Sequence, residues 1–461
     1  MKNVKKKKLY IVLLLSMLLI GGLAIYAGYT YIKNEDKVLF ENTLRTDYAT
    51  MVAVFLIVLP LLLAVLAACA VFLKKAKRNA AVRIAVPADS PKKQKPAQET
   101  PTGERFCMLS EIDRNSGKYG RMFYEKGVTL ESFCNDFRSY AANKLKLYYD
   151  IEDIRRFVAG LAVSKLVILQ GMSGTGKTSL AHEFGSFTDN SSTVIPVQPM
   201  WKERTDLIGY YNEFTKRFNE TLLLEKMYEA NYSEDMYITV LDEMNIARVE
   251  YYFAEFLSLL ELPNPDERYL DVVSDKWDSD PKQFVGGRIK LPENMWFIGT
   301  ANNDDSTFAI SDKVYDRAMI LNLDTKCERF SAPSTPKKPI SAEQFRALAD
   351  NAVKEYGVSG RNARRLEEFD RYLIEHFHIT FGNRIMKQIR TYIPVYVACG
   401  GTELTALDDI LAKKVIRKLE TQNPIYLRNS AEELLSFIDD LFGADKMPLC
   451  KEYVHRLQRN A

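Results

Sequence analysis

The sequence has few of the residues that build metal centres or covalent cross-links. Among its 461 residues there are only 4 His and 6 Cys. The cysteines are scattered and never form a CxxC pair, so the sequence indicates neither a zinc site nor a disulfide framework. Two of the histidines, His376 and His378, are two positions apart and do not share a helix face. We therefore expect reduced thiols, and no pattern of metal-ligating histidines is present.

Most of the chain also lacks the basic excess that a broad nucleic-acid surface needs. Residues 1–103 carry 16 basic and 6 acidic side chains, whereas the remainder carries 47 basic and 54 acidic ones. The formal net charge of +3 thus combines a basic N-terminal region with an acidic body. The acidic body argues against broad binding of nucleic acid, and the basic region suits anionic lipid headgroups.

The stretch 166–180, which reads LVILQGMSGTGKTSL, has the pattern of a phosphate-binding loop. A short, mainly apolar strand is followed at once by the GxxxxGK[ST] spacing and then by the start of a helix. Backbone amides and the helix N-terminus would bind the phosphates of ATP. Lys177 would reach the β- and γ-phosphates, and Thr178 would hold Mg²⁺. A chance glycine turn is the alternative, but both flanks fit the motif.

The residues predicted to bind the nucleotide in this stretch are Gly171, Met172, Ser173, Gly174, Thr175, Gly176, Lys177, Thr178 and Ser179.

A second nucleotide motif follows the apolar run 236–241, which ends in Asp242-Glu243. Ligands of open α/β sheets bind beyond the carboxyl ends of the strands, so both acids are expected to face the phosphates. Asp242 would bind Mg²⁺, directly or through water, and Glu243 would act as general base on the attacking water. An acidic pair is a weak signal alone, but downstream of a complete glycine loop it indicates hydrolysis.

Two further candidate residues stand next to later strands of the expected sheet. Asn302 follows the apolar run 295–300, where it would contact the attacking water and the γ-phosphate, or merely cap a turn. Arg317 precedes the run 318–323 at the sheet edge. There it would reach the nucleotide of a neighbouring subunit, or make only a local ion pair.

The apolar runs and helical periodicities predict an α/β fold with an all-α region after it. We expect strands at 166–170, 193–197, 236–241, 295–300 and 318–323. Helices are expected at 130–141, 150–163, 214–231 and 246–262, and then at 342–356, 362–376, 383–397, 403–419 and 431–441. The loop 198–211 contains Trp201 and Tyr210, which either line it or contact a substrate or neighbouring subunit. The polar stretch 262–294 is predicted to be an insertion with a small hairpin.

Two long runs without any charged residue, 9–32 and 48–73, each exceed the roughly 20 residues that span a bilayer. Basic residues precede the first run and follow the second, while the loop 33–47 holds three basic and four acidic residues. The positive-inside rule then places both ends in the cytosol. The sequence thus predicts a multi-pass protein of the cell membrane, anchored in the lipid bilayer by two transmembrane helices.

A cleaved signal peptide is the other interpretation of the first run, because Ala24-Ile25-Tyr26-Ala27 loosely resembles a cleavage site. Cleavage would leave the second run to reverse the orientation, or would place the phosphate-binding loop outside the cell, where ATP is not supplied. We therefore favour the membrane hairpin.

These patterns predict the following domains: a membrane anchor at 1–78, a disordered linker at 79–104, a helical lead-in at 105–150, a P-loop core at 151–325, a second linker at 326–340, and a helical lid with C-terminal helices at 341–461.

Taken together, the motifs resemble an AAA+ ATPase module, with the dynein-related, MoxR-like and McrB-type branch as the nearest group. The resemblance covers roughly residues 130–420. It rests on GMSGTGKTSL at 171–180, LDEMN at 241–245, FAEFLSLLE at 253–261, FIGTANNDDST at 297–307, ISDKVYDRA at 310–318 and FGNRI at 381–385. The resemblance implies a parallel P-loop sheet with helices on both faces, an all-α lid, and a ring, usually of six subunits.

Carried over position by position, Asn302 matches the first sensor of this family, Arg317 the trans arginine finger and Arg384 the second sensor. McrB-type GTPases have a Met-Asn-Thr-x-Asp run where this chain has Ala301-Asn302-Asn303-Asp304-Asp305. This departure favours ATP over GTP. Those proteins also begin with a DNA-binding region, where this chain has the predicted membrane hairpin.

Three functions are compatible with the sequence. A membrane-anchored AAA+ ATPase would remodel or activate an unknown protein partner. A nucleotide-driven motor would instead serve a McrB-like nuclease or a phage-defence system, which a basic stripe in the ring pore would favour. A nucleotide-binding scaffold would hydrolyse little, but the intact Glu243 argues against it.

Overall fold

The computed structural model describes residues 103–121, 123–302, 307–324 and 327–460. Both predicted membrane segments, 9–32 and 48–73, lie outside these ranges, as does most of the predicted linker 79–104. Within the described ranges, no helix has the length and apolar character needed to cross a bilayer.

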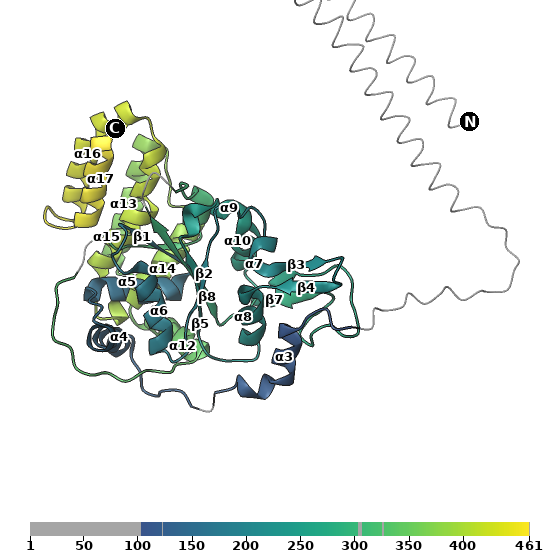
Figure 1. Ribbon diagram of the computed structural model, residues 1–461. Coiled ribbons are helices and arrows are strands. Elements are labelled where there is room, and N and C mark those ends of the chain that lie inside the picture. The colour runs from purple at the N-terminus through teal and green to yellow at the C-terminus, as the bar shows by residue number, and fades with distance from the viewer. Residues whose placement is uncertain (1–102, 122, 303–306, 325–326, 461) are drawn as a thin grey trace, which may run out of the picture. The chain divides into compact units, whose positions relative to one another are not determined.

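A five-stranded parallel sheet forms the centre of the described residues, in the order β2-β5-β8-β1-β9 (Figure 1). Its strands are β1 (Leu166–Gly171), β2 (Thr193–Pro196), β5 (Tyr237–Asp242), β8 (Met295–Asn302) and β9 (Met319–Asn322). All five strands expected from the apolar runs are therefore present. Because every pair is parallel, all five carboxyl ends lie at one edge, and the glycine loop leaves β1 there.

Alternate side chains of each strand enter two separate cores, one on each face of the sheet. Val167 and Leu169 of β1 pack with α4, α5, α6 and the C-terminal helices. Leu166 and Ile168 of the same strand pack on the other face with α3, α8 and α10. Helices on both faces explain why the strands are apolar without interruption, and the predicted α/β fold with a helical C-terminal region is confirmed.

The helices around the sheet are α3 (Met108–Arg114), η1 (Ser116–Lys118), α4 (Leu130–Leu145), α5 (Ile151–Val163), α6 (Lys177–Phe187), α7 (Thr205–Ile208), α8 (Leu222–Ala230), η2 (Met244–Ile246), α9 (Val249–Tyr252), α10 (Ala254–Glu261), η3 (Pro265–Glu267) and α11 (Asp312–Tyr315). The helix expected over 246–262 is thus broken. The 3-10 helix η2 ends at Ile246, and the extended backbone of the next residue, Ala247 (φ −123°, ψ 164°), cannot continue a helix.

Two antiparallel hairpins stand outside the main sheet. The predicted insertion hairpin is present as β6 (Tyr269–Asp271) and β7 (Arg288–Lys290). A second hairpin, β3 (Gly209–Asn212) and β4 (Arg217–Glu220), was not expected, and it shows that the predicted helix 214–231 begins too early. At Gly209 the φ angle is +94° and a Cβ would lie 1.9 Å from the Asn219 carbonyl oxygen, so this hairpin requires glycine there.

The C-terminal region is entirely helical: α12 (Ala342–Glu355), α13 (Gly360–Phe377), α14 (Gly382–Ala398), α15 (Glu403–Lys414), η4 (Ile416–Thr421), α16 (Pro424–Phe442) and α17 (Pro448–Asn460). The helix expected at 431–441 begins earlier, because Asn423 caps its N-terminus and Pro424 occupies the first turn. The helix α17 was not predicted. Figure 1 shows α16 and α17 at the opposite end of the described residues from the β3–β4 hairpin.

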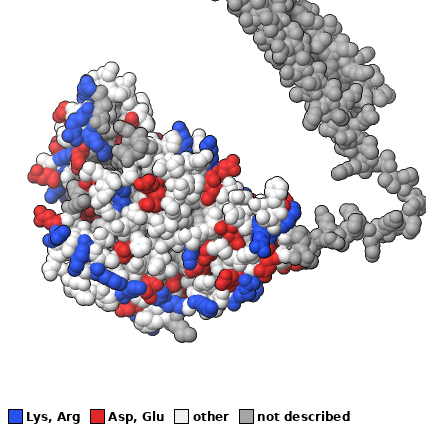
Figure 2. All heavy atoms as spheres, viewed as in Figure 1, with Lys and Arg blue, Asp and Glu red and all other residues white. Residues whose placement is uncertain are grey.

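On the face seen in Figure 2, basic and acidic side chains are interspersed and do not separate into regions of one sign. This mixture agrees with the composition of residues 104–461, which hold 47 basic and 54 acidic side chains.

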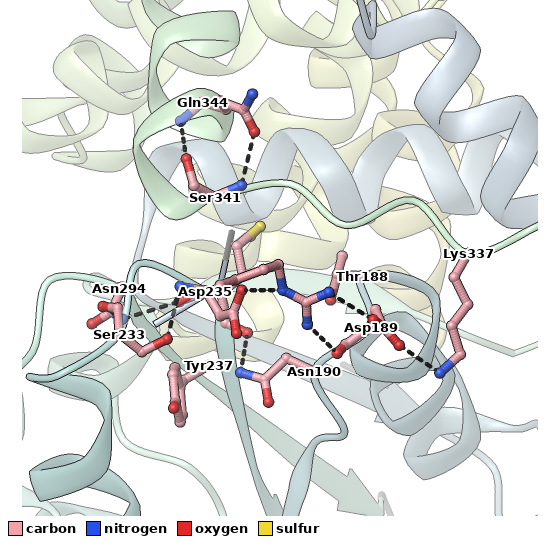
Figure 3. Close-up of polar contacts among 12 residues, drawn as sticks. Thr188, Asp189, Asn190, Ser233, Asp235, Tyr237, Asn294, Lys337, Ser341 and Gln344 are labelled. Carbon is pink, nitrogen blue, oxygen red and sulfur yellow. Dashed lines mark hydrogen bonds and ion pairs between the residues drawn. The ribbon is translucent and has the colours of Figure 1, made fainter. Parts of the chain in front are cut away.

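A polar cluster, drawn in Figure 3, lies near the amino ends of the strands, at the opposite edge of the sheet from the glycine loop. Asp189, after α6, accepts hydrogen bonds from Arg121 at 2.6 Å and from Lys337 at 2.7 Å. Arg121 also donates to Asp235, just before β5, at 2.9 Å. These bonds connect the segments before α4 and before α12 to the same edge of the sheet. Ser341 and Gln344 form a capping box at the start of α12.

Candidate nucleotide site

Two glycines at the ends of the glycine loop are closely approached by neighbouring groups. At Gly171 the φ angle is +140° and a Cβ would lie 2.5 Å from the Leu323 carbonyl oxygen of the neighbouring chain segment. Gly176 caps the N-terminus of α6 in the left-handed region, and its carbonyl accepts a hydrogen bond from the Tyr149 hydroxyl at 3.0 Å. The loop therefore ends in a preformed helix N-terminus, which favours anions.

Lys177 is buried at the start of α6 although it carries a charge. Its ammonium donates to the carbonyl oxygens of Gly171 at 2.9 Å and Met172 at 2.7 Å. The Thr175 hydroxyl also donates to the Met172 carbonyl, at 3.0 Å. Met172, Ser173 and Gly174 are exposed at the top of the loop. The cation thus lies inside the loop whose amides were predicted to bind phosphate.

The two nucleotide motifs meet at Asp242. The Thr178 hydroxyl donates to Asp242 Oδ1 at 2.7 Å, so the end of the loop touches the end of β5. Thr300 of β8 donates to the same oxygen at 2.8 Å. A hydroxyl and a carboxylate in contact are oxygen ligands of the kind that Mg²⁺ prefers, and a bound triphosphate would supply the others. Among the described residues there is no cluster of three or more His, Cys, Asp or Glu side chains that would hold a metal alone.

Glu243 follows Asp242 in an unusual backbone conformation. Its φ is +52°, and its N–H donates to the Thr300 hydroxyl at 2.9 Å. The residue is exposed, so its carboxylate is accessible to water and ligand. A non-glycine residue in the left-handed region costs free energy and is often found at functional sites.

Asn302 ends β8 beside the glycine loop, because it pairs in register with Gly171. Its backbone is held on both sides by the side chain of Asn245, which donates to the Asn302 carbonyl at 2.9 Å and accepts from its N–H at 3.4 Å. Asn245 also donates to the Phe308 carbonyl at 3.3 Å, across residues 303–306, which are not described. The first-sensor role of Asn302 remains a prediction.

Arg317 and Arg384 lie together and share one partner. Arg317 is ion-paired with Glu261, the last residue of α10, and donates to the Lys313 carbonyl at 2.6 Å. Arg384, near the start of α14, pairs with the other carboxylate oxygen of the same glutamate. The structure therefore groups the two predicted arginines with each other. Their roles in trans and in cis remain predictions.

The two aromatic residues of the loop after β2 differ. Trp201 is half-buried and packs edge-on against Tyr252, with ring centroids 5.6 Å apart. Tyr210 lies on β3 and is exposed. Trp201 is therefore explained by packing within the protein, whereas the ring of Tyr210 is accessible at the surface.

Four residues of this region were given no role from the sequence: Thr300, Asn245, Tyr149 and Glu261. Asn245 and Thr300 stand inside the quoted motifs LDEMN and FIGTANN, so their positions were visible although their contacts were not. Glu261 ends the quoted motif FAEFLSLLE, so its position was visible as well. Tyr149 acts across the fold and lies in none of the quoted motifs.

Comparisons with known proteins agree with this geometry. Residues 166–318 match the family described as AAA domain (dynein-related subfamily). We refer to these residues as the AAA domain, after the family that they match. Residues 334–461, which follow the AAA domain, match a family described as a domain of unknown function (DUF8727).

One curated relative is similar over part of its length. It is the EcoKMcrB subunit of a type IV methyl-directed restriction enzyme from Escherichia coli (strain K12), 25% identical over 207 residues. The match covers 43% of this chain and 42% of that protein, so the chain spans less than half of its relative.

Two solved structures are similar to this chain in shape. A presumed ATPase from Cytophaga hutchinsonii has a TM-score of 0.40 at 13% identity, covering 67% of this chain and 85% of that one. A full-length MCM homologue from Methanopyrus kandleri has a TM-score of 0.32 at 12% identity, covering 69% and 59%.

Proposed function

We propose that the AAA domain binds and hydrolyses ATP with Mg²⁺. The observation that carries this proposal is the meeting of Thr178, Asp242 and Thr300 beside a glycine loop, with Glu243 exposed at the same strand end. A loop that only bound an anion would need neither the shared carboxylate nor an adjacent accessible acid.

Each side chain has a distinct task in this proposal. The loop amides and Lys177 would bind the phosphates, and Thr178 with Asp242 would hold Mg²⁺. The bound ion would supply charge neutralisation at the phosphate oxygens. Glu243 would orient a water and accept its proton, and Asn302 would fix the water from the neighbouring strand. Arg317 of an adjacent subunit would balance the charge that develops on the γ-phosphate.

The ring, the membrane anchor and the partner belong to the same proposal. The predicted trans role of Arg317 requires an assembly, of which a homo-hexamer is the form expected for this family. The runs 9–32 and 48–73 would tether it to the cell membrane, with the AAA domain in the cytosol. Hydrolysis there would remodel or activate a protein partner.

A nuclease motor is the second candidate, favoured by the partial similarity to the EcoKMcrB subunit. The mixed charge on the visible face and the acidic body argue against broad nucleic-acid binding. ATP turnover by the full-length chain, measured with and without double-stranded DNA at low and moderate salt, separates the two candidates. Stimulation by DNA that weakens with salt would support the motor.

Two substitutions test hydrolysis itself. Lys177→Ala should lose most ATP affinity, because it removes the cation inside the loop. Glu243→Gln should retain ATP binding and lose turnover by at least about a hundredfold, the lower range for a general base. Fluorescent-nucleotide titration and phosphate release measure the two effects, with the exposed acid variant Asp271→Asn as control. Parental turnover in Glu243→Gln would show that Glu243 is not the general base.

A further inference from the structure

The segment that carries Arg317, residues 312–318, is held by helices of the C-terminal region. Gln388 of α14 donates to the Asp316 carbonyl at 3.1 Å. Arg417 of η4 pairs with Asp312 at 2.7 Å, and its guanidinium lies over the Tyr315 ring, 4.2 Å from the centroid. We call residues 312–318 the Arg317 segment.

Lys414, the last residue of α15, makes the central contact to the Arg317 segment. Its ammonium is buried and donates to the carbonyl oxygens of Tyr315, at 2.6 Å, and Ala318. These two carbonyls stand on either side of Asp316-Arg317, so one cation closes the turn from which the Arg317 side chain leaves. A buried ammonium needs such partners, because its desolvation is costly.

The other end of Arg317 is held by Glu261. The carboxylate bridges Arg317 and Arg384, and so joins the start of β9, the end of α10 and the start of α14. The Glu261 carboxylate is only partly buried, so its ion pairs can exchange. A phosphate oxygen would compete with this carboxylate for either guanidinium.

We propose that Lys414 and Glu261 are positioning residues for Arg317, which set its backbone and its guanidinium toward the nucleotide of an adjacent subunit. Lys414 fixes the turn from the C-terminal helices, and Glu261 keeps the guanidinium extended until the nucleotide replaces it. A displacement of α14 and α15 would then move Arg317 with them. This inference rests on the proposed ATP hydrolysis with Arg317 in trans.

The test uses assemblies of two full-length subunit types. The acceptor carries Arg317→Ala and keeps its nucleotide loop, whereas the donor carries Lys177→Ala and keeps Arg317. Turnover in the mixture arises where a donor arginine completes an acceptor site. Pull-down with two different tags shows that mixed assemblies form. Lys414→Met or Glu261→Gln is then added to the donor or, separately, to the acceptor.

The expected result is directional. Either substitution in the donor should lower mixed turnover by at least about fivefold with little change in the KM for ATP. In the acceptor, whose own Arg317 is already absent, Lys414→Met should leave turnover unchanged. Glu261→Gln in the acceptor also removes the partner of Arg384, the predicted second sensor, so its effect is compared between the donor and the control Glu255→Gln. A structural role would lower turnover from both positions. Lys413→Met and Glu255→Gln are matched controls, because Lys413 instead pairs with Asp409 and Glu255 with Arg204.

The outcomes separate the two proposals. No turnover in the parent mixture, with mixed assemblies present, would overturn the trans role of Arg317 and this inference with it. Parent turnover that the donor variants leave intact would overturn the positioning role alone. Glu261→Gln keeps the test decisive where Lys414→Met fails to fold, because Glu261 is partly exposed.

Discussion

The hydroxyl of Thr300 contacts both acidic residues of the nucleotide site. It donates to the Asp242 carboxylate and accepts from the Glu243 N–H, so it connects the proposed metal ligand to the proposed general base. Threonine is β-branched and suits a strand, and valine has nearly the same shape without the hydroxyl. The residue thereby offers a substitution that removes two hydrogen bonds and little packing.

We predict that Thr300→Val lowers ATP turnover at least about tenfold, which corresponds to roughly 1.4 kcal/mol of lost transition-state stabilisation. ATP affinity should change much less, because the loop and Lys177 are untouched. Phosphate release and nucleotide titration measure the two effects. Thr239→Val, a buried threonine three residues before Asp242 on β5, is the control. Equal losses in both variants would show that strand packing, and not the hydroxyl, matters.

Lys414 also gives a pH dependence to stability. Burial lowers its pKa to about 7, Asp316 opposes this shift, and the nearby cations Arg417, Lys418 and Arg384 add to it. In the unfolded chain the pKa is about 10.4. Between these values the unfolded chain binds more protons, so the free energy of unfolding rises with pH.

We therefore predict that raising the pH from 7 to 9 stabilises the parent relative to Lys414→Met by up to about 2 kcal/mol. Urea unfolding at both pH values measures this difference, which cancels the contributions of other groups. Identical pH slopes in the two proteins would show that Lys414 keeps an ordinary pKa in the fold.

At the scale of elements, the sequence identified the parts whose patterns are local. The strand β1 and the glycine loop are continuous in sequence, and the acids after β5 stand directly behind an apolar run. The β3–β4 hairpin was missed because its strands have four residues each and β4 buries little besides Phe218. The helix predicted at 214–231 therefore includes the β4 strand in front of the apolar periodicity of α8.

The shared partner of Arg317 and Arg384 was missed for another reason. Glu261 lies 56 residues before Arg317, and only the packing of α10, α14 and the Arg317 segment brings them together. The same holds for Arg121, whose partners Asp189 and Asp235 lie 68 and 114 residues further along the chain (Figure 3). Such contacts depend on the tertiary fold, and a single sequence carries no local sign of them.

A buried polar network joins α5 to α14 and α15. Asp409 is ion-paired with Lys413 and with Arg156, 3.2 Å away, and accepts from the Tyr392 hydroxyl at 2.6 Å. Burial lowers the pKa of Lys413 in spite of this pairing. The Asp409 carboxylate is thus the shared counter-charge of Arg156 on α5 and Lys413 on α15.

We predict that Asp409→Asn destabilises the fold by about 3 kcal/mol or more, because it removes the ion-pair partner of the buried Lys413 and leaves Arg156 with Asp153 alone. Urea unfolding followed by tryptophan fluorescence measures the loss. The control is Glu213→Gln, which breaks an exposed ion pair with Lys216 in the β3–β4 hairpin and should cost about 0.5 kcal/mol or less. Equal small effects would mean that water replaces the carboxylate.

At the scale of the whole molecule, charge divides the chain into two parts. The basic excess lies in residues 1–103, next to the two long uncharged runs, whereas the AAA domain and the C-terminal helices belong to the acidic remainder. Such a division suits a body that is held near an anionic membrane surface by its N-terminal region without adhering to it. The proposed location therefore depends on the topology of the two runs.

We predict that the runs 9–32 and 48–73 form a hairpin with both ends in the cytosol. Basic residues flank the outer ends of the two runs, whereas the loop 33–47 has no excess of basic residues. The loop is therefore the part expected on the outer side of the membrane. A reporter active only in the cytosol should give signal after Arg78, and one active only outside should give signal near Glu41. Activity of the exterior reporter after residue 104 would contradict the hairpin, because it would place the AAA domain outside the cell.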